Sequence, residues 1–368
     1  MRTNPFTPSF GSNPRILAGR ENVLAPMRQA FEQGYGDPNL ASILVGARGT
    51  GKTTLLSGII ASANERGWLG VNVSALPGML DDILQQSYRR SGHVLEPEKK
   101  MRLSSIEISK LLNVKWEALQ EPTQNWRSKM TRILEGLEEH DIGLLICVDE
   151  VDPTLDEVKE LVSVYQHFVQ ENRHVALVLA GLPHKVSSLL ADDDISFLRR
   201  ARRHDIGRIS DADVRFALER TFEDGGKAIR PEAAELSVRA IQGFPYMLQL
   251  VGYWIWNTAG YDPTAGTDAA TKGIALARED MRQGILGATY DTLSDGDRRF
   301  IAAMLQDPEK STLSAVASRM GVKSNYASRY KRRLLEQGII GEYGRNVLRF
   351  EIPASREYFD EERLSEDE

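Results

Sequence analysis

The feature that most constrains this chain is the stretch Gly46-Ala47-Arg48-Gly49-Thr50-Gly51-Lys52-Thr53, which fits the pattern G-x-x-x-x-G-K-[ST]. A short apolar run, 43–45, precedes it, and residues 54–66 follow with apolar side chains at helical spacing. A strand, a glycine-rich loop and a helix in this order predict a loop that binds phosphate groups. Glycines allow the backbone N–H groups to turn toward phosphate oxygens, and the helix adds the positive end of its dipole.

Two carboxylates form the second strong signal. The apolar run 142–148 ends in Asp149 and Glu150, and the carboxyl ends of parallel strands meet at one edge of a sheet. Two acids after a buried strand often only solvate its end, but the upstream loop favours a functional interpretation. We expect Lys52 to reach the β- and γ-phosphates of ATP, Thr53 and Asp149 to hold Mg²⁺, and Glu150 to orient or deprotonate the attacking water.

Composition excludes several classes of protein. The 368 residues are 41% hydrophobic and 27% charged, and no apolar run approaches the ~18–20 residues of a membrane span. A single cysteine, Cys147, allows neither a disulfide framework nor a cysteine metal cluster. The first fifteen residues lack the apolar core of a secretory signal, so we expect a cytoplasmic protein without a membrane segment. Because the net charge is −6, any surface that binds DNA must be local.

The order of patterns along the chain predicts distinct parts. Strand-like and helix-like segments alternate up to residue 209, which predicts a parallel α/β sheet with helices on both faces. Residues 210–289 are helical in pattern and predict a lid and a connector. A basic patch closes the first part, and it is either a solvated face or the source of a side chain that reaches the γ-phosphate on a neighbouring subunit. Its arginines are Arg199, Arg200, Arg202 and Arg203.

The C-terminal part, 290–353, predicts three helices followed by a hairpin, the pattern of a winged helix-turn-helix. It contains eleven Lys or Arg and eight Asp or Glu, a local charge of +3. An outward polar and basic stripe on the third helix and a basic hairpin tip predict a DNA-binding surface, although such a fold also serves protein contacts. The predicted DNA-binding residues are Asn325, Ser328, Arg329, Arg332 and Arg345.

Taken in order, these residues resemble the AAA+ ATPases of the origin-recognition initiator type, from about Arg15 to Pro353. The resemblance implies an AAA+ core (15–209), a helical lid and connector (210–289) and a winged helix (290–353). Outside it, the composition predicts a flexible N-terminal segment (1–14) and an acidic tail (354–368). The segment 16–21 matches the stretch that lies against adenine in such ATPases. The nucleotide-binding residues implied are Arg15, Ile16, Gly19, Gly46, Ala47, Arg48, Gly49, Thr50, Gly51, Lys52, Thr53, Thr54 and Pro245.

Two departures from that family shift the expected function. The strand ending Ala180-Gly181-Leu182-Pro183 lacks the Asn, Ser or Thr that usually forms the first sensor, and Gly243-Phe244-Pro245 replaces the second-sensor arginine. The Gly-x-Pro turn resembles the STAND signalling ATPases and bacterial AAA+ proteins with a terminal helix-turn-helix. We therefore expect a slow, switch-like ATPase that binds DNA and forms homo-oligomers, with Arg199 or Arg200 acting across the subunit border. Two alternatives are a STAND-like signalling ATPase with a protein effector, and a regulator of transposition or of a mobile-element or defence nuclease.

Overall fold

The computed structural model describes residues 3–9, 14–95, 125–342 and 347–366. The chain forms two units. The sheet unit comprises Glu21–Val45 and Leu55–Asp205, and the lid unit comprises Met1–Arg20, Gly46–Thr54 and Ile206–Glu368. No helix within the described ranges is long and apolar enough to cross a membrane.

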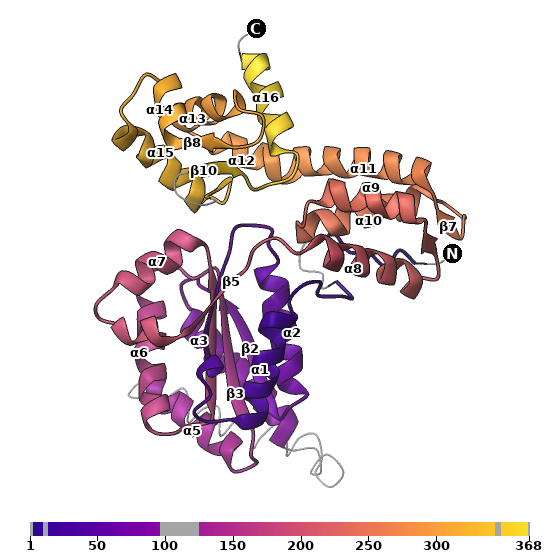
Figure 1. The fold of residues 1–368 in the computed structure, drawn as a ribbon. Coiled ribbons are helices and arrows are strands. Elements are labelled where there is room, and N and C mark those ends of the chain that lie inside the picture. Colours follow the sequence, from indigo (N-terminus) through magenta and orange to yellow (C-terminus); the bar gives the residue numbers. More distant parts are fainter. Residues whose placement is uncertain (1–2, 10–13, 96–124, 343–346, 367–368) are drawn as a thin grey trace. The chain divides into compact units, whose positions relative to one another are not determined.

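A five-stranded parallel sheet forms the centre of the sheet unit, with the strand order β2-β3-β4-β1-β5 (Figure 1). The strands are β1 (Ala41–Val45), β2 (Trp68–Ser74), β3 (Gly143–Asp149), β4 (Val175–Gly181) and β5 (Arg202–Asp205). Every residue of β3 and β4 is buried, as expected for strands covered on both faces. Val45 pairs with Gly181, and Val148 pairs with Leu179, so β1, β3 and β4 end at the same edge.

Helices cover both faces of this sheet, which confirms the predicted fold class. Figure 1 shows α1 and α2 on one face and α6 and α7 on the other, while α3 packs against α5 and α6. The helices are α1 (Glu21–Gln33), α2 (Lys52–Asn64), α3 (Met79–Leu95), α5 (Trp126–Glu138), α6 (Asp156–Gln170) and α7 (Pro183–Ala191). Two short 3₁₀ turns, η1 (Pro38–Leu40) and η3 (Ser196–Arg200), precede β1 and β5.

Four helices form the lid: α8 (Asp211–Asp224), α9 (Pro231–Ile241), α10 (Pro245–Thr258) and α11 (Thr267–Met281). Two short strands, β6 (Ala228–Ile229) and β7 (Thr264–Ala265), pair in parallel. They connect the loop before α9 with the loop before α11. The sequence predicts a flexible lead-in over residues 1–14, but the Phe6 side chain is only 2% exposed and packs in the apolar cluster of the lid. The Asn4 amide also donates a hydrogen bond to the Tyr253 carbonyl oxygen at 3.0 Å. This part of the segment is therefore a packed element of the lid.

The C-terminal domain, residues 290–366, contains the three predicted helices and an antiparallel sheet of order β8-β10-β9. A π-helical turn, η4 (Arg282–Leu286), and α12 (Gly287–Asp291) connect it to α11. Its elements are α13 (Asp295–Leu305), β8 (Ser311–Thr312), α14 (Leu313–Arg319), α15 (Ser324–Glu336), β9 (Ile340–Glu342), β10 (Val347–Phe350) and α16 (Ser355–Glu366). The predicted acidic tail is largely this last helix, and its Phe359 is 1% exposed in the core of the domain.

Candidate functional site

Residues 46–51 form the loop between β1 and α2, and α2 begins at Lys52. Gly49 and Gly51 have φ angles of 75° and 85°. This left-handed region is rarely adopted by residues that carry a Cβ. These are the two positions at which the curl of the predicted phosphate loop requires glycine.

Close packing in the lid unit fixes the shape of this loop. A Cβ at Gly46 would lie 2.4 Å from the Ile206 carbonyl oxygen, and a Cβ at Gly49 would lie 2.4 Å from Cζ of Phe244. Both separations are too short for any real Cβ contact. The aromatic ring of the Gly-Phe-Pro turn that precedes α10 thus rests directly on the loop.

The lid unit brings together several of the predicted nucleotide-binding residues. Ile16 is half-buried against the apolar cluster of the lid, and a Cβ at Gly19 would lie 2.8 Å from Cγ2 of Ile209. A Cβ at Gly51 would lie 3.7 Å from Cβ of Pro245, an ordinary contact. The side chains of three further predicted residues are exposed: Arg15, Arg48 and Thr53.

The Lys52 ammonium group lies over the loop that precedes it. It donates hydrogen bonds to the carbonyl oxygens of Gly46 and Ala47 at 2.9 and 2.8 Å. The hydroxyl of Thr50 donates to the Ala47 carbonyl oxygen at 2.9 Å, which closes the loop from the inside. Lys52, Thr53 and Thr54 are the first residues of α2, so they stand at the positive end of its dipole.

Arg20 lies within the segment 16–21 that the resemblance places near adenine, but it was not itself among the predicted nucleotide-binding residues; it is a buried charged group beside the loop. Its side chain is 7% exposed, and its guanidinium donates to the carbonyl oxygens of Thr50 and Gly207 at 2.9 and 2.7 Å. Burial lowers the pKa of Arg20, while the Asp213 carboxylate on α8 acts to raise it. One side chain therefore joins the phosphate loop to the segment that leads into the lid.

The acidic pair lies in the sheet unit, where β3 ends. Asp149 is 6% exposed, and its carboxylate accepts a hydrogen bond from the Glu150 backbone N–H at 2.8 Å. Glu150 is exposed and has a φ angle of 53°, a left-handed conformation that costs energy for a residue with a Cβ. Backbone strain of this kind concentrates at functional sites. At the end of β3, one carboxylate residue is therefore buried and the next is exposed.

No sensor-type Asn, Ser or Thr follows β4. Leu182 occupies the N-cap position of α7 without a side-chain hydrogen bond, and Pro183 is the first residue of this helix. The next residue, His184, has a buried Nδ1 atom without a hydrogen-bond partner in the described part of the chain. Lys185 pairs with Asp152 at 2.8 Å and holds the pKa of that carboxyl down to about 2, together with hydrogen bonds from Thr154. His184 is thus a polar group at this edge of the sheet that no sequence pattern marks.

The four arginines near β5 divide into two pairs. Arg199 is held by the Leu190 carbonyl oxygen at 2.7 Å and by Asp193 at 3.1 Å, and Arg203 pairs with Asp205 at 3.0 Å. Arg200 and Arg202 are exposed, and neither forms an ion pair with the described residues. Of the two arginines proposed to act across a subunit border, Arg200 is therefore the one without an ion pair of its own.

On α15, the predicted stripe is mostly exposed. Asn325, Arg329 and Arg332 point to solvent, and Arg332 is 77% exposed with a distant pairing to Glu336 at 3.5 Å. Ser328 is half-buried and donates its hydroxyl hydrogen to the Ser324 carbonyl oxygen at 2.9 Å. Arg345, predicted at the hairpin tip, lies outside the described residues.

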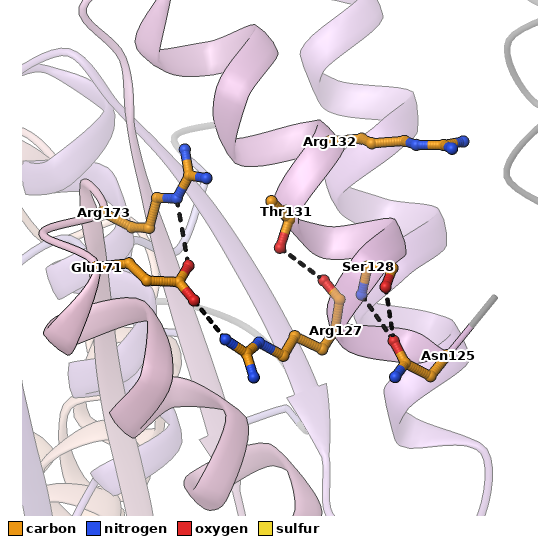
Figure 2. Close-up of a pocket in the computed structure, with 7 residues that line it drawn as sticks. All are labelled: Asn125, Arg127, Ser128, Thr131, Arg132, Glu171 and Arg173. Carbon is orange, nitrogen blue, oxygen red and sulfur yellow. Dashed lines mark hydrogen bonds and ion pairs between the residues drawn. The ribbon is translucent and has the colours of Figure 1, made fainter.

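An open hollow of about 530 Å³ lies elsewhere in the sheet unit, and Figure 2 shows its lining. Glu171 pairs with both Arg127 and Arg173, while Asn125 accepts a hydrogen bond from the Ser128 backbone at the start of α5. The lining holds three arginines and one glutamate, and Glu171 pairs with two of these arginines. No predicted site residue lines this hollow. Its lining residues are Asn125, Arg127, Ser128, Thr131, Arg132, Glu171 and Arg173.

Comparison with known families and structures agrees with this arrangement. Residues 37–190 match the AAA domain family, and residues 283–359 match a domain of unknown function (DUF8462). No curated protein sequence matches the chain.

Two solved structures share the fold over nearly the whole length. The ORC2 protein of Aeropyrum pernix, solved as ADPNP and ADP complexes, is 14% identical, with 98% of this chain and 97% of that chain covered and a TM-score of 0.64. The Walker-type ATPase paby2304 of Pyrococcus abyssi is also 14% identical, with 96% and 99% covered and a TM-score of 0.65. Residues 37–190 thus match the AAA domain family, and the chain shares the fold of these two structures.

Proposed function

We propose that this protein is an ATP-binding and ATP-hydrolysing AAA+ switch that binds duplex DNA through a C-terminal winged helix. The ATP-binding part of this proposal rests on the phosphate loop, which lies within the residues that match the AAA domain family. Its two left-handed glycines, and the lysine at the start of α2, form the cradle that the G-x-x-x-x-G-K-[ST] pattern requires.

The place of each site residue in its own element supports the role proposed for it. Gly46 directly follows β1, and Asp149 ends β3 at the same edge of the parallel sheet. The exposed Thr53 hydroxyl and the Asp149 carboxylate offer the hard oxygen ligands that Mg²⁺ prefers, and the ion would neutralise phosphate charge. Lys52 would bind the β- and γ-phosphates. Glu150, exposed on its strained turn, would orient the attacking water.

DNA binding is supported by the C-terminal domain. Three helices and an antiparallel hairpin are the elements of a winged helix, and α15 presents the exposed Asn325, Arg329 and Arg332. Phosphate contacts from the arginines would govern affinity, and Asn325 or Arg329 would read bases. Homo-oligomers with ATP at their borders would complete the switch.

The experiment measures retention of duplex DNA by the full chain with and without ATP across a salt series. We expect tighter retention with ATP, and a log–log slope that changes by about −0.9 for each phosphate contact. Lys52→Ala should lose the response to ATP because the phosphate cradle is incomplete. Glu150→Gln should keep that response and lose hydrolysis by a factor of about 10²–10³, the usual cost of a preorganised catalytic group.

One observation favours a second candidate, a STAND-like signalling ATPase whose winged helix contacts protein. In the lid turn, Phe244 lies against the phosphate loop and Pro245 lies beside Gly51. The lid therefore contacts the loop directly, without a sensor arginine. If the ATP-loaded chain retains no duplex at low salt while it still hydrolyses ATP, this candidate replaces DNA binding. A regulator of transposition or of a nuclease would instead retain DNA and require a protein partner.

A further inference from the structure

The exposed face of α15 carries an aromatic ring beside its polar stripe. Tyr326 lies in the first turn of α15, is 46% exposed, and is not a member of the apolar core of the C-terminal domain. Asn325, the residue before it, and Arg329, three residues after it, are also exposed. Phosphate contacts require no ring at this position, so a role for the ring has to be argued from its contacts.

The ring is held in place by its neighbour one turn later. The ring centroids of Tyr326 and Tyr330 are 5.5 Å apart at an interplanar angle of 69°, and the Tyr330 hydroxyl donates to the Tyr326 hydroxyl at 3.0 Å. The Arg329 guanidinium lies 5.9 Å from the centre of the Tyr326 ring. Two neighbours thus hold Tyr326 with part of its ring facing solvent.

Tyr330 is in turn anchored to the rest of the domain. It packs against α13 so closely that a Cβ at Gly296 would lie 2.2 Å from Cε1 of Tyr330. The absence of a side chain at Gly296 makes this approach possible. The chain of contacts from α13 through Tyr330 therefore fixes Tyr326 before any ligand arrives, which reduces the entropy cost of using it in recognition.

We propose that Tyr326 is a specificity-determining residue that contacts the 5-methyl group of a thymine in the major groove. This inference rests on the proposed DNA binding. Residues near the amino end of a recognition helix contact base edges, and the thymine methyl group is the apolar feature of the major-groove edges. A fixed aromatic ring matches that feature. Arg329 beside it suits the O6 and N7 acceptors of a neighbouring guanine.

The test compares thymine with uracil, which differ only in this methyl group. Duplexes that bind the full chain are enriched from a pool of random sequences. Each thymine of the enriched site is then replaced in turn by uracil, introduced as deoxyuridine. We expect at least one replacement to weaken binding about fourfold, the weight of one buried methyl-sized group. Tyr326→Phe should keep this discrimination, and Tyr326→Ala should bind thymine and uracil duplexes equally. The salt slope should not change in either variant.

Matched controls separate the outcomes. Tyr261 is 88% exposed in the lid unit, so Tyr261→Ala should leave both affinity and discrimination unchanged. Duplex binding with no preference for thymine over uracil, or a preference that survives in Tyr326→Ala, would overturn the role of Tyr326 and leave the DNA-binding proposal intact. Failure of the parental chain to bind any duplex at low salt would overturn both.

Discussion

Most of the proposed chemistry depends on single residues, and the sequence predicts some of these residues but not others. The pattern G-x-x-x-x-G-K-[ST] names its residues because each has a fixed physical task, and Gly49 and Gly51 adopt the φ angles that such a loop needs. Arg20 could not be found in this way. Its guanidinium reaches Thr50 and Gly207, which are distant in sequence, and no local spacing announces such a contact.

Replacement of Arg20 tests whether that contact holds the phosphate loop in shape. A hydrogen bond from a charged donor contributes about 1.5–3 kcal/mol, and Arg20→Met removes two of them. We expect the affinity for an ATP analogue, measured by calorimetry, to fall about tenfold or more, equivalent to about 1.4 kcal/mol. Arg20→Lys should recover only part of it, because an ammonium group lacks the planar fork.

The matched control is Arg220→Met on α8. Arg220 is 55% exposed, and among the described residues its ion pairs are with Glu223 and Asp224 at the surface, where such pairs contribute little. It should bind the analogue as the parental chain does. An Arg20→Met variant with parental affinity and only a lower melting temperature would show that Arg20 stabilises the fold without positioning the loop.

The buried strands could be predicted from the sequence, whereas the charged strand at the edge of the sheet could not. β3 and β4 are apolar throughout because helices cover both faces of the sheet, so they stand out in the sequence. β5 consists of Arg202, Arg203, His204 and Asp205, and within the described part of the chain it is an edge strand paired with β1. Its backbone hydrogen bonds define it as a strand, while its side chains have the composition of a solvated surface, so the sequence predicted only a basic patch there.

The contact between the phosphate loop and the lid turn can be tested with an added methyl group. Gly49→Ala should suffer backbone strain of roughly 1–2 kcal/mol and also a clash with Phe244, and ATP-analogue binding should be lost. Gly36→Ala is the control, because Gly36 has a φ angle of 92° and nothing lies within 4 Å of the place that a methyl group there would take. It should show the strain in thermal unfolding with unchanged binding. Adding Phe244→Ala to Gly49→Ala should restore part of the stability, and no recovery would mean that the ring does not press on the loop.

At the scale of the whole molecule, the order of the parts was predictable because each part has its own local pattern. The division into two units could not be predicted, because Gly46–Thr54 belongs to the lid unit through non-local contacts with Phe244, Ile206 and Arg20. The same topology bears on assembly. Arg202 is opposite Ser42 in the parallel pairing of β5 with β1, three residues before Val45. Arg200 therefore starts on the order of 10 Å or more from the end of β1 that leads into the phosphate loop.

This position predicts that Arg200 serves the nucleotide of a neighbouring copy. Arg200→Ala should lower the ATPase rate of the assembled protein by a large factor, since arginine fingers contribute on the order of 10³–10⁵ in rate. A Lys52→Ala chain is inactive for a different reason, because it cannot hold its own nucleotide. Mixing the two variants should restore activity, as Lys52→Ala subunits supply Arg200 to the intact nucleotide sites of Arg200→Ala subunits.

Arg203→Ala, which removes an arginine already paired with Asp205, is the control and should remain active alone. If the mixture stays inactive while both variants still assemble, another arginine, with the exposed Arg202 first, takes the role. If Arg200→Ala alone hydrolyses ATP at the parental rate, no arginine at this position acts in trans.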